Sequence, residues 1–249
     1  ALLSVYRIGV HVPTPGIDAV ALARDLVNTP PRDKAPLDLA QRATDAASDT
    51  SLKVELWKVD RLHKERMGGI LGVGLGSHRP PCLLKLTHSV RKPKAKLAIV
   101  GKGITFDSGG LSIKPSNMME TMKSDMAGAA AVIGAMIAIS KLGIPVQVTG
   151  YAALAENLPG GGAQRPGDVL TARNGKTIEV INTDAEGRLI PDASGRPFRQ
   201  WRPPLDPALN EGREAWPGIR RPDDIWQEIV RVAELPGTTA RWSTCRVVT

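Results

Sequence analysis

Residues 182–189 (NTDAEGRL) carry two carboxylates and a guanidinium, at Asp184, Glu186 and Arg188, which alternate with other residues. In an extended segment, side chains two positions apart point to the same side, so this spacing predicts one shared face. Two carboxylates that close repel each other, and burying them unpaired is unfavourable. We therefore expect a cationic group between them, and Gly187 would let the backbone turn or approach a ligand there.

A second stretch offers partners for these groups. Residues 97–100 (LAIV) predict a buried strand, and Lys102 and Asp107 follow it before a glycine-rich turn. Lys114 comes shortly afterwards, and Asp125 stands at the start of a predicted helix. The chain would thus gather four carboxylates, two lysines and one arginine at strand ends and a helix start. Such an oxygen-rich cluster suits a pair of divalent ions bridged by shared carboxylates.

Four blocks in this order, VGKGITFDSGG, SIKP, KSDMAGAAAV and NTDAEGRL, resemble the leucyl aminopeptidase (cytosol aminopeptidase) family of two-metal exopeptidases. The order, the residue types and the spacing match from about residue 19 to residue 190. The resemblance implies a metallopeptidase that releases N-terminal residues, with leucine preferred, from peptides that have a free N-terminus. It also implies a cytoplasmic protein that forms homohexamers.

The resemblance implies a ligand set for two divalent metal ions, Mn²⁺ or Zn²⁺. One ion would be held by Asp107, Asp184 and Glu186, and the other by Lys102, Asp107, Asp125 and Glu186, so that Asp107 and Glu186 bridge both. A lysine must lose its proton to act as a ligand, which a nearby dication can enforce. On spacing alone, a salt bridge between Lys102 and Asp107 and a helix-start role for Asp125 are the simpler interpretations.

The resemblance also implies two catalytic residues. Lys114 would stabilise the oxyanion of the tetrahedral intermediate, and Arg188 would hold a bicarbonate ion that shuttles protons. Without the surrounding motifs, Lys114 would be interpreted as a surface lysine beside Pro115, and Arg188 as a structural partner of Asp184.

Composition excludes little. The 249 residues allow one large or two small domains, and two cysteines do not form a disulfide framework, which favours a reducing compartment. We see no signal-peptide pattern and no apolar segment of membrane length. The net charge of +8 admits a nucleic-acid-binding alternative. The basic run at residues 91–96 has no interleaved aromatic residues, however, and a solvated loop is the better interpretation.

Strands that alternate with helices predict an α/β catalytic domain, with a mixed, mainly parallel sheet flanked by helices and a metal site at the carboxyl ends of the strands. Residues 97–100 are expected to pair with residues 82–86. The glycines of residues 67–77 predict close packing rather than a nucleotide-binding loop, because they lack a strand–turn–helix context. We expect helices at residues 19–27, 37–47 and 125–142, strands at 54–57, 82–86, 97–100, 146–154 and 178–181, and a hairpin turn at 174–176.

We expect three parts along the chain. Residues 1–18 would be the remnant of an N-terminal domain with its linker, and residues 19–190 a partial metallo-aminopeptidase catalytic domain. Residues 191–249 contain nine Arg, no Lys and four of the five Trp, which predicts a divergent tail, either frameshifted or poorly ordered. A partial catalytic domain would be poorly stable and weakly active or inactive, so an inactive subunit that retains metal binding is the alternative function.

Overall fold

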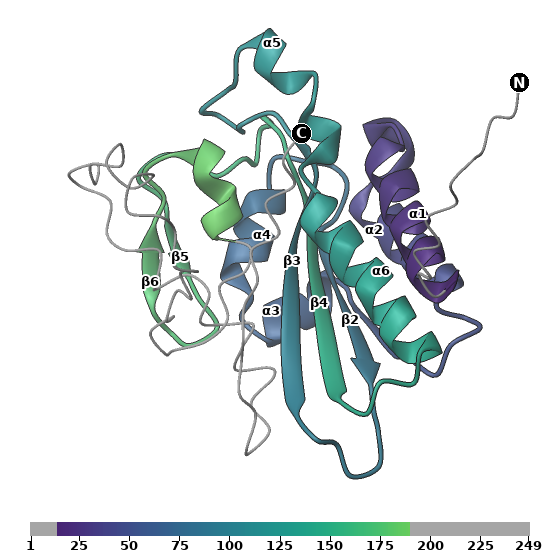
Figure 1. Cartoon of the computed structure of the whole chain (residues 1–249). Helices are drawn as coiled ribbons and strands as arrows, with labels where there is room; N and C mark the ends of the chain where they lie inside the picture. The colour runs from purple at the N-terminus through teal and green to yellow at the C-terminus, as the bar shows by residue number, and fades with distance from the viewer. Residues whose placement is uncertain (1–13, 190–249) are drawn as a thin grey trace, which may run out of the picture.

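The computed structural model describes residues 14–189, apart from the Arg188 side chain, and the expectations for residues 1–13 and 190–249 lie outside this part. Helices and strands are interspersed along the chain (Figure 1). In order they are α1 (Thr14–Asn28), η1 (Pro31–Asp33), α2 (Pro36–Ala46), β1 (Lys53–Trp57), α3 (Val59–Lys64), α4 (Gly68–Gly74), β2 (Cys82–His88), β3 (Lys96–Asp107), α5 (Ser116–Met119), η2 (Met122–Ser124), α6 (Ala127–Lys141), β4 (Gln147–Asn157), β5 (Val169–Thr171), β6 (Thr177–Glu179) and η3 (Thr183–Arg188).

A four-stranded sheet in the order β1-β2-β4-β3 forms the middle layer. Successive residues of β4 point to opposite faces, so Ala152 and Leu154 join one buried cluster, while Tyr151 and Ala153 join the other. The first cluster includes residues of α1, α2 and α6, and the second includes residues of α3 and α4. Helices therefore cover both faces of the sheet (Figure 1), and apolar side chains fill the space between the layers.

The expected α/β class and mixed sheet are confirmed, with two corrections within the described strands. Only the β3–β4 pairing is parallel, while β1–β2 and β2–β4 are antiparallel, so parallel pairing does not predominate here. The strand at residues 82–88 pairs with β1 and β4 and not with β3. The reason is that α6 makes a crossover between β3 and β4, which places these two strands side by side.

The β3–α6–β4 unit depends on glycine at the contact between helix and strand. A Cβ atom added to Gly101 of β3 would lie 2.3 Å from the carbonyl oxygen of Gly128 on α6, which no structure tolerates without a shift. Gly101 is buried, so the helix approaches the strand backbone directly at this point. This close approach places the beginning of α6 next to the end of β3.

The glycine-rich segment forms helix α4, and its glycines permit close packing as expected. Added Cβ atoms would lie 2.2 Å from the carbonyl oxygen of Thr171 at Gly68 and 2.1 Å from that of Leu189 at Gly69. Because α4 follows α3 rather than a strand, the strand–turn–helix context of a nucleotide-binding loop is absent from this segment. The hairpin expected around Gly175 is confirmed as β5 and β6, which pair in antiparallel register.

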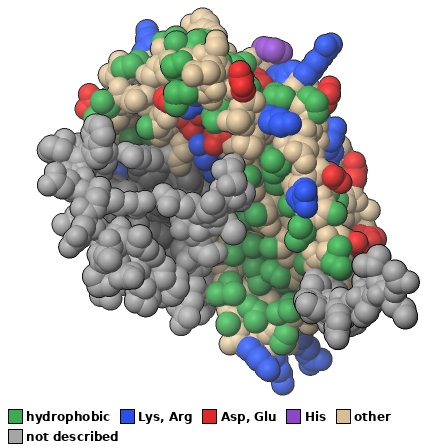
Figure 2. Space-filling model, turned by 45° about the horizontal axis from the view of Figure 1, so that its top comes forward, with side chains coloured by type: hydrophobic (Ala, Val, Ile, Leu, Met, Phe, Trp, Pro, Cys, Tyr) green, Lys and Arg blue, Asp and Glu red, His purple; other side chains and the backbone are tan. Residues whose placement is uncertain are grey.

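One expectation about the membrane needs correction. Residues Ser116–Lys141 contain an 18-residue stretch with a mean hydropathy of 1.4, so by length and composition alone this segment could cross a membrane. The α6 part of this segment contributes Ile133 and Met136 to the core against the sheet, as the core helix of a globular domain does. On the face in Figure 2, acidic and basic side chains are scattered among hydrophobic and other atoms over the upper part of the molecule, and the described residues form no patch of one charge there.

The close contact between β3 and α6 predicts that Gly101→Ala destabilises the protein. The added methyl group forces the backbones of β3 and α6 apart, which should cost about 1–3 kcal/mol of the free energy of unfolding. Urea unfolding followed by circular dichroism measures this loss. The control is Gly161→Ala, since a Cβ atom there meets nothing within 4 Å, and it should change stability by less than about 0.5 kcal/mol. Equal midpoints for the two variants would contradict the packing argument.

Candidate metal centre

Asp107 is the last residue of β3, and a bulge in this strand sets the direction of its side chain. Ile104 lies opposite Ala155 of β4, whereas Asp107 lies opposite Asn157, so β3 has one residue more than its partner between these points. In a regular strand, Lys102 and Asp107 would point to opposite faces because they are five positions apart. The extra residue brings both side chains to the same side of the sheet.

Asp125 lies in the turn between η2 and α6, two residues before the helix begins, and not at the helix start itself. The buried ammonium of Lys34 fixes this turn. It donates hydrogen bonds to the carbonyl oxygens of Leu26 and Val27 at the end of α1 (3.1 and 3.0 Å) and to that of Lys123 (2.7 Å). Lys34 thus connects the end of α1 to the residues that immediately precede Asp125.

The segment with Asp184 and Glu186 is a 3-10 helix, η3, and the prediction of an extended segment was wrong. The side chain of Asn182 accepts a hydrogen bond from the backbone N–H of Asp184 (2.8 Å), which caps the helix and stabilises the turn over an extended strand. The two carboxylates consequently contact different cations, instead of sharing one as their spacing had suggested.

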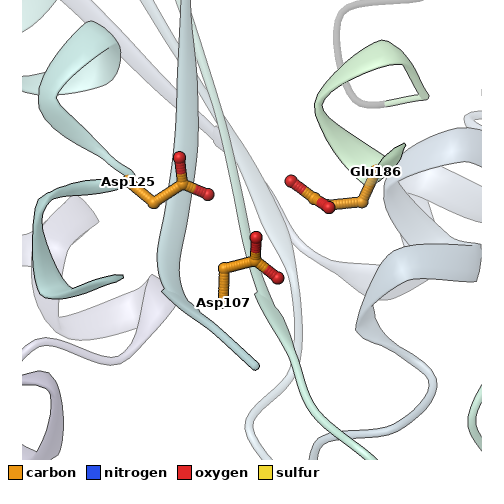
Figure 3. Close-up of side chains that lie close together, drawn as sticks. All are labelled: Asp107, Asp125 and Glu186. Carbon is orange, nitrogen blue, oxygen red and sulfur yellow. The ribbon is translucent and has the colours of Figure 1, made fainter. Parts of the chain in front are cut away.

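Three carboxylates from three separate elements converge on one point (Figure 3). Asp107, Asp125 and Glu186 each offer an oxygen, and these three oxygens all lie within 4.8 Å of one another. The side chain of Glu186 is 1% exposed and that of Asp107 is 4% exposed. Buried carboxylates this close to one another stay ionised only if cations lie among them.

Two lysines supply that positive charge. Lys102 Nζ lies 2.7 Å from Glu186 Oε1 and 2.8 Å from Asp125 Oδ2. Lys114 Nζ lies 3.3 Å from Asp107 Oδ2 and also pairs with Asp184. The interpretation of Lys114 as a surface lysine is therefore wrong, and Lys102 forms its salt bridges with Asp125 and Glu186 rather than with Asp107. Each lysine joins two carboxylates that lie far apart in the sequence.

The charges of the cluster shift the pKa values of its members. Burial raises the pKa of Asp125 to about 6, because loss of hydration outweighs the attraction of Lys102. Burial by itself lowers the pKa of the Lys102 ammonium, but the carboxylates of Asp125 and Glu186 outweigh it and raise that pKa. The pKa of Lys114 is also raised, since Asp184 and Asp107 outweigh its burial. Both lysines therefore carry a proton in the metal-free protein at neutral pH.

The donor set fits hard divalent cations. Carboxylate oxygens are the ligands that Mn²⁺ and Mg²⁺ prefer, and Zn²⁺ also accepts them. Asp125 Oδ2 is buried and accepts no hydrogen bond of good geometry, although it forms an ion pair with Lys102. The ammonium of Lys102 stands where positive charge is needed, and Gly187 leaves room for it, because a Cβ atom there would lie 3.0 Å from Lys102 Nζ.

The structure thus brings together six of the seven residues expected in the site, and the side chain of the seventh, Arg188, lies outside the described part. The sequence analysis did not identify Asn157 and Thr183 as parts of the site. Thr183 Oγ1 donates to the carbonyl oxygen of Gly109 (2.6 Å), and Asn157 lies at the end of β4 beside Asp107. A polar residue that ends the apolar strand YAALAEN was the available signal for Asn157.

A family model described as "Cytosol aminopeptidase family, catalytic domain" matches residues 21–191. Two curated relatives are the probable cytosol aminopeptidases of Rhodococcus opacus (strain B4), 56% identical over 174 residues, and of Streptomyces coelicolor (strain ATCC BAA-471 / A3(2) / M145), 53% identical over 185 residues. These alignments cover 70% and 74% of this chain but 34% and 36% of the relatives. The chain therefore spans about a third of the length of the curated relatives that it matches.

A solved structure shares the fold of this part of the chain. The bottromycin maturation enzyme BotP in complex with Mn superposes with a TM-score of 0.67 at 43% sequence identity. The superposition covers 71% of this chain and 38% of that one.

The raised pKa of Asp125 predicts how pH affects the metal-free protein. Its folded-state pKa of about 6 exceeds the ordinary value of 3.8, so the folded state loses stability as pH rises from about 4 to about 6. Asp125→Asn has no charge to gain, and from pH 4 to pH 7.5 it should become more stable relative to the original protein by on the order of 1 kcal/mol. Urea unfolding in EDTA at both pH values measures this difference.

Asp168→Asn is the matched control, because a hydrogen bond from the Arg165 backbone lowers the pKa of Asp168. From pH 4 to pH 7.5, Asp168→Asn should become less stable relative to the original protein, which is the opposite of the change in Asp125→Asn. Parallel pH profiles for Asp125→Asn and the original protein would show that the Asp125 carboxylate is not destabilised by burial.

Proposed function

The chain belongs to the cytosol aminopeptidase family, and from this premise we propose that its described part carries the metal site of an aminopeptidase that removes N-terminal residues from peptides. The observation that supports this most directly is the convergence of Asp107, Asp125 and Glu186 from three different elements. A buried cluster of carboxylates has no structural advantage over an apolar core, since its charges must be compensated. A site for a divalent cation gives this costly arrangement a function.

We propose that Asp107, Asp184 and Glu186 would hold one divalent ion and that Lys102, Asp107, Asp125 and Glu186 would hold a second. When bound, such ions polarise a scissile carbonyl and make hydroxide available from water near neutral pH. Manganese is a candidate because the similar BotP structure is described as a complex with Mn, and zinc accepts the same ligands. The rest of the reaction depends on the protein groups around the ions.

Lys102 is protonated in the metal-free site, so an ion can use its amine as a ligand only if the proton leaves. A raised lysine pKa opposes that loss, whereas a dication next to the amine favours it. Protons and metal ions would therefore compete for Lys102, and metal affinity would increase with pH. Gly187 has no side chain to fill the space beside this amine, so the space stays open whether the amine carries a proton or binds a metal ion.

Lys114 suits a role as an electrophilic group rather than as a base. Its raised pKa keeps the ammonium protonated at neutral pH, and its side chain is only 11% exposed. With Asp107 and Asp184 engaged by metal ions, this ammonium would be free to donate a hydrogen bond to the oxyanion that forms at the scissile carbonyl. The ion pairs with these two carboxylates hold Lys114 at the proposed metal site until then.

Further properties of the protein follow from the family resemblance. Arg188 would bind bicarbonate, leucine would be the preferred N-terminal residue, and the substrates would be peptides with a free N-terminus. Cytoplasmic location and homohexameric assembly are proposed from the family resemblance. The family and the charged cluster favour a peptidase over a nucleic-acid-binding protein, because the cluster of acidic residues would repel phosphates.

We expect Glu186→Gln to weaken Mn²⁺ binding to the full chain by at least about tenfold, because it removes a charged ligand that both ions would share. Isothermal titration calorimetry measures the binding, and release of 4-nitroaniline from L-leucine 4-nitroanilide measures turnover. Any Mn²⁺-dependent turnover of the original chain should disappear in this variant. Asp168→Asn, on the loop before β5, should keep both properties. Equal Mn²⁺ affinity in Glu186→Gln and the original chain would contradict the assigned site.

The competition at Lys102 predicts that Mn²⁺ binding releases protons. Titrations at pH 7.5 in buffers with different ionisation enthalpies give the number of protons released per ion bound. Lys102→Met should release about one proton fewer per chain than the original protein, because the methionine has no proton to lose. Lys141→Met, which removes an ammonium that pairs with Asp49 at the surface, is the control. The same release from Lys102→Met and the original protein would exclude Lys102 as a ligand.

A further inference from the structure

Asn157, the last residue of β4, lies between the two carboxylates that are proposed to bridge the ions. The residue is 1% exposed, and its Nδ2 group lies 2.8 Å from Asp107 Oδ1 and 3.5 Å from Glu186 Oε2. The same group also donates to the carbonyl oxygen of Thr183 at 3.1 Å. These three acceptors fix the orientation of the amide, since Asn157 Oδ1 in that place would face only other acceptors.

In each of these two carboxylates, Asp107 and Glu186, the two oxygens contact different partners. Asp107 presents Oδ1 to Asn157 and Oδ2 to Lys114, while Glu186 presents Oε2 to Asn157 and Oε1 to Lys102. Each carboxylate thus has one oxygen directed toward the neutral amide and the other directed toward a cation. The amide therefore limits the rotation of both carboxylates, together with the backbone N–H of Gly109, which also donates to Asp107 Oδ1 (2.9 Å). One oxygen of each carboxylate stays free for positive charge.

Asn157 also joins the backbone segments that carry these carboxylates. Its carbonyl oxygen accepts hydrogen bonds from the backbone N–H and from the hydroxyl of Ser108, in the turn that follows β3 (3.0 and 2.9 Å). Its amide holds the carbonyl oxygen of Thr183 at the start of η3. One buried residue therefore connects the end of β4, the turn after Asp107 and the 3-10 helix that contains Glu186.

We propose that Asn157 is a positioning residue of the metal centre, which sets the spacing and orientation of Asp107 and Glu186 for two divalent cations. This inference rests on the proposed function, because it concerns the same site. A neutral donor suits this place better than a third lysine, since it binds both carboxylates without occupying the space for a cation. It also suits the place better than a carboxylate, which would repel Asp107 and Glu186.

The test compares Asn157→Ala with the original chain by isothermal titration with MnCl₂ in protein first freed of metal with EDTA. Asn157→Ala removes the amide and keeps the backbone hydrogen bonds to Ser108. We expect the dissociation constant for Mn²⁺ to rise by about 10- to 100-fold, as for other residues that orient metal ligands. The exposed Asn117 on α5 provides the control, and Asn117→Ala should bind Mn²⁺ as the original chain does.

A second readout separates positioning from general stability. The melting temperature is measured in EDTA and in excess MnCl₂, and the increase caused by Mn²⁺ should be smaller in Asn157→Ala than in the original chain. A purely structural residue would lower both melting temperatures equally and leave the affinity unchanged. If Asn157→Ala does not fold in EDTA, Asn157→Ser takes its place with the same expectation, because its hydroxyl is too short to reach both carboxylates.

The outcomes distinguish this inference from the proposed function. If the original chain does not bind Mn²⁺, the proposed function fails and the inference about Asn157 fails with it. If the original chain binds Mn²⁺ and a folded Asn157 variant binds it equally well, only the positioning role is overturned. Weaker binding in the Asn157 variant, with unchanged binding in Asn117→Ala, supports both.

Discussion

The parallel pairing of β3 with β4, with its single bulge, is the constraint on which the rest of the site depends. Without the extra residue between Ile104 and Asp107, the side chains of Lys102 and Asp107 would point to opposite faces of the sheet. The bulge places Asp107 opposite Asn157 and allows both strands to end at the same edge. The close approach of Gly101 to Gly128 then brings the beginning of α6, and the turn with Asp125, against that edge.

Electrostatic repulsion explains why so many segments must be held in place there. Asp107, Asp125 and Glu186 would separate if nothing opposed their charges, and in the metal-free protein Lys102 and Lys114 oppose them. Neutral groups secure the segments themselves, as Thr183 does through its contact with Gly109. These hydrogen bonds would keep the carboxylates in place when the proposed metal ions replace the lysine ammonium groups as their partners.

The described residues account for about a third of the length of the curated relatives, and this part contains all the carboxylates of the proposed site. The proposals about the substrate and about assembly concern the full length of such proteins, of which this chain covers only a part. Metal binding can be studied in this chain separately from those properties, since all the proposed ligands come from β3, the η2–α6 turn and η3. The buried Lys34 belongs to this local structure because it secures the turn before Asp125.

The sequence by itself determined the family, the identity of the charged residues and the α/β class, because these depend on residue types, motif order and hydrophobic periodicity. It also predicted the hairpin turn at Gly175 and the close packing of the glycines in α4, which follow from the local properties of glycine. It did not reveal the order of the strands, since pairing depends on contacts between distant segments.

Only the tertiary structure decided which carboxylate meets which lysine. Alternation along residues 182–189 suggested one shared face, but the cap by Asn182 stabilises a 3-10 helix, in which Asp184 pairs with Lys114 and Glu186 with Lys102. The bulge in β3 and the position of Asn157 were equally hidden, because both arise from register between two strands rather than from either strand alone. Sequence spacing determines how residues of one segment lie relative to each other, whereas the site forms through contacts between segments that are far apart in the sequence.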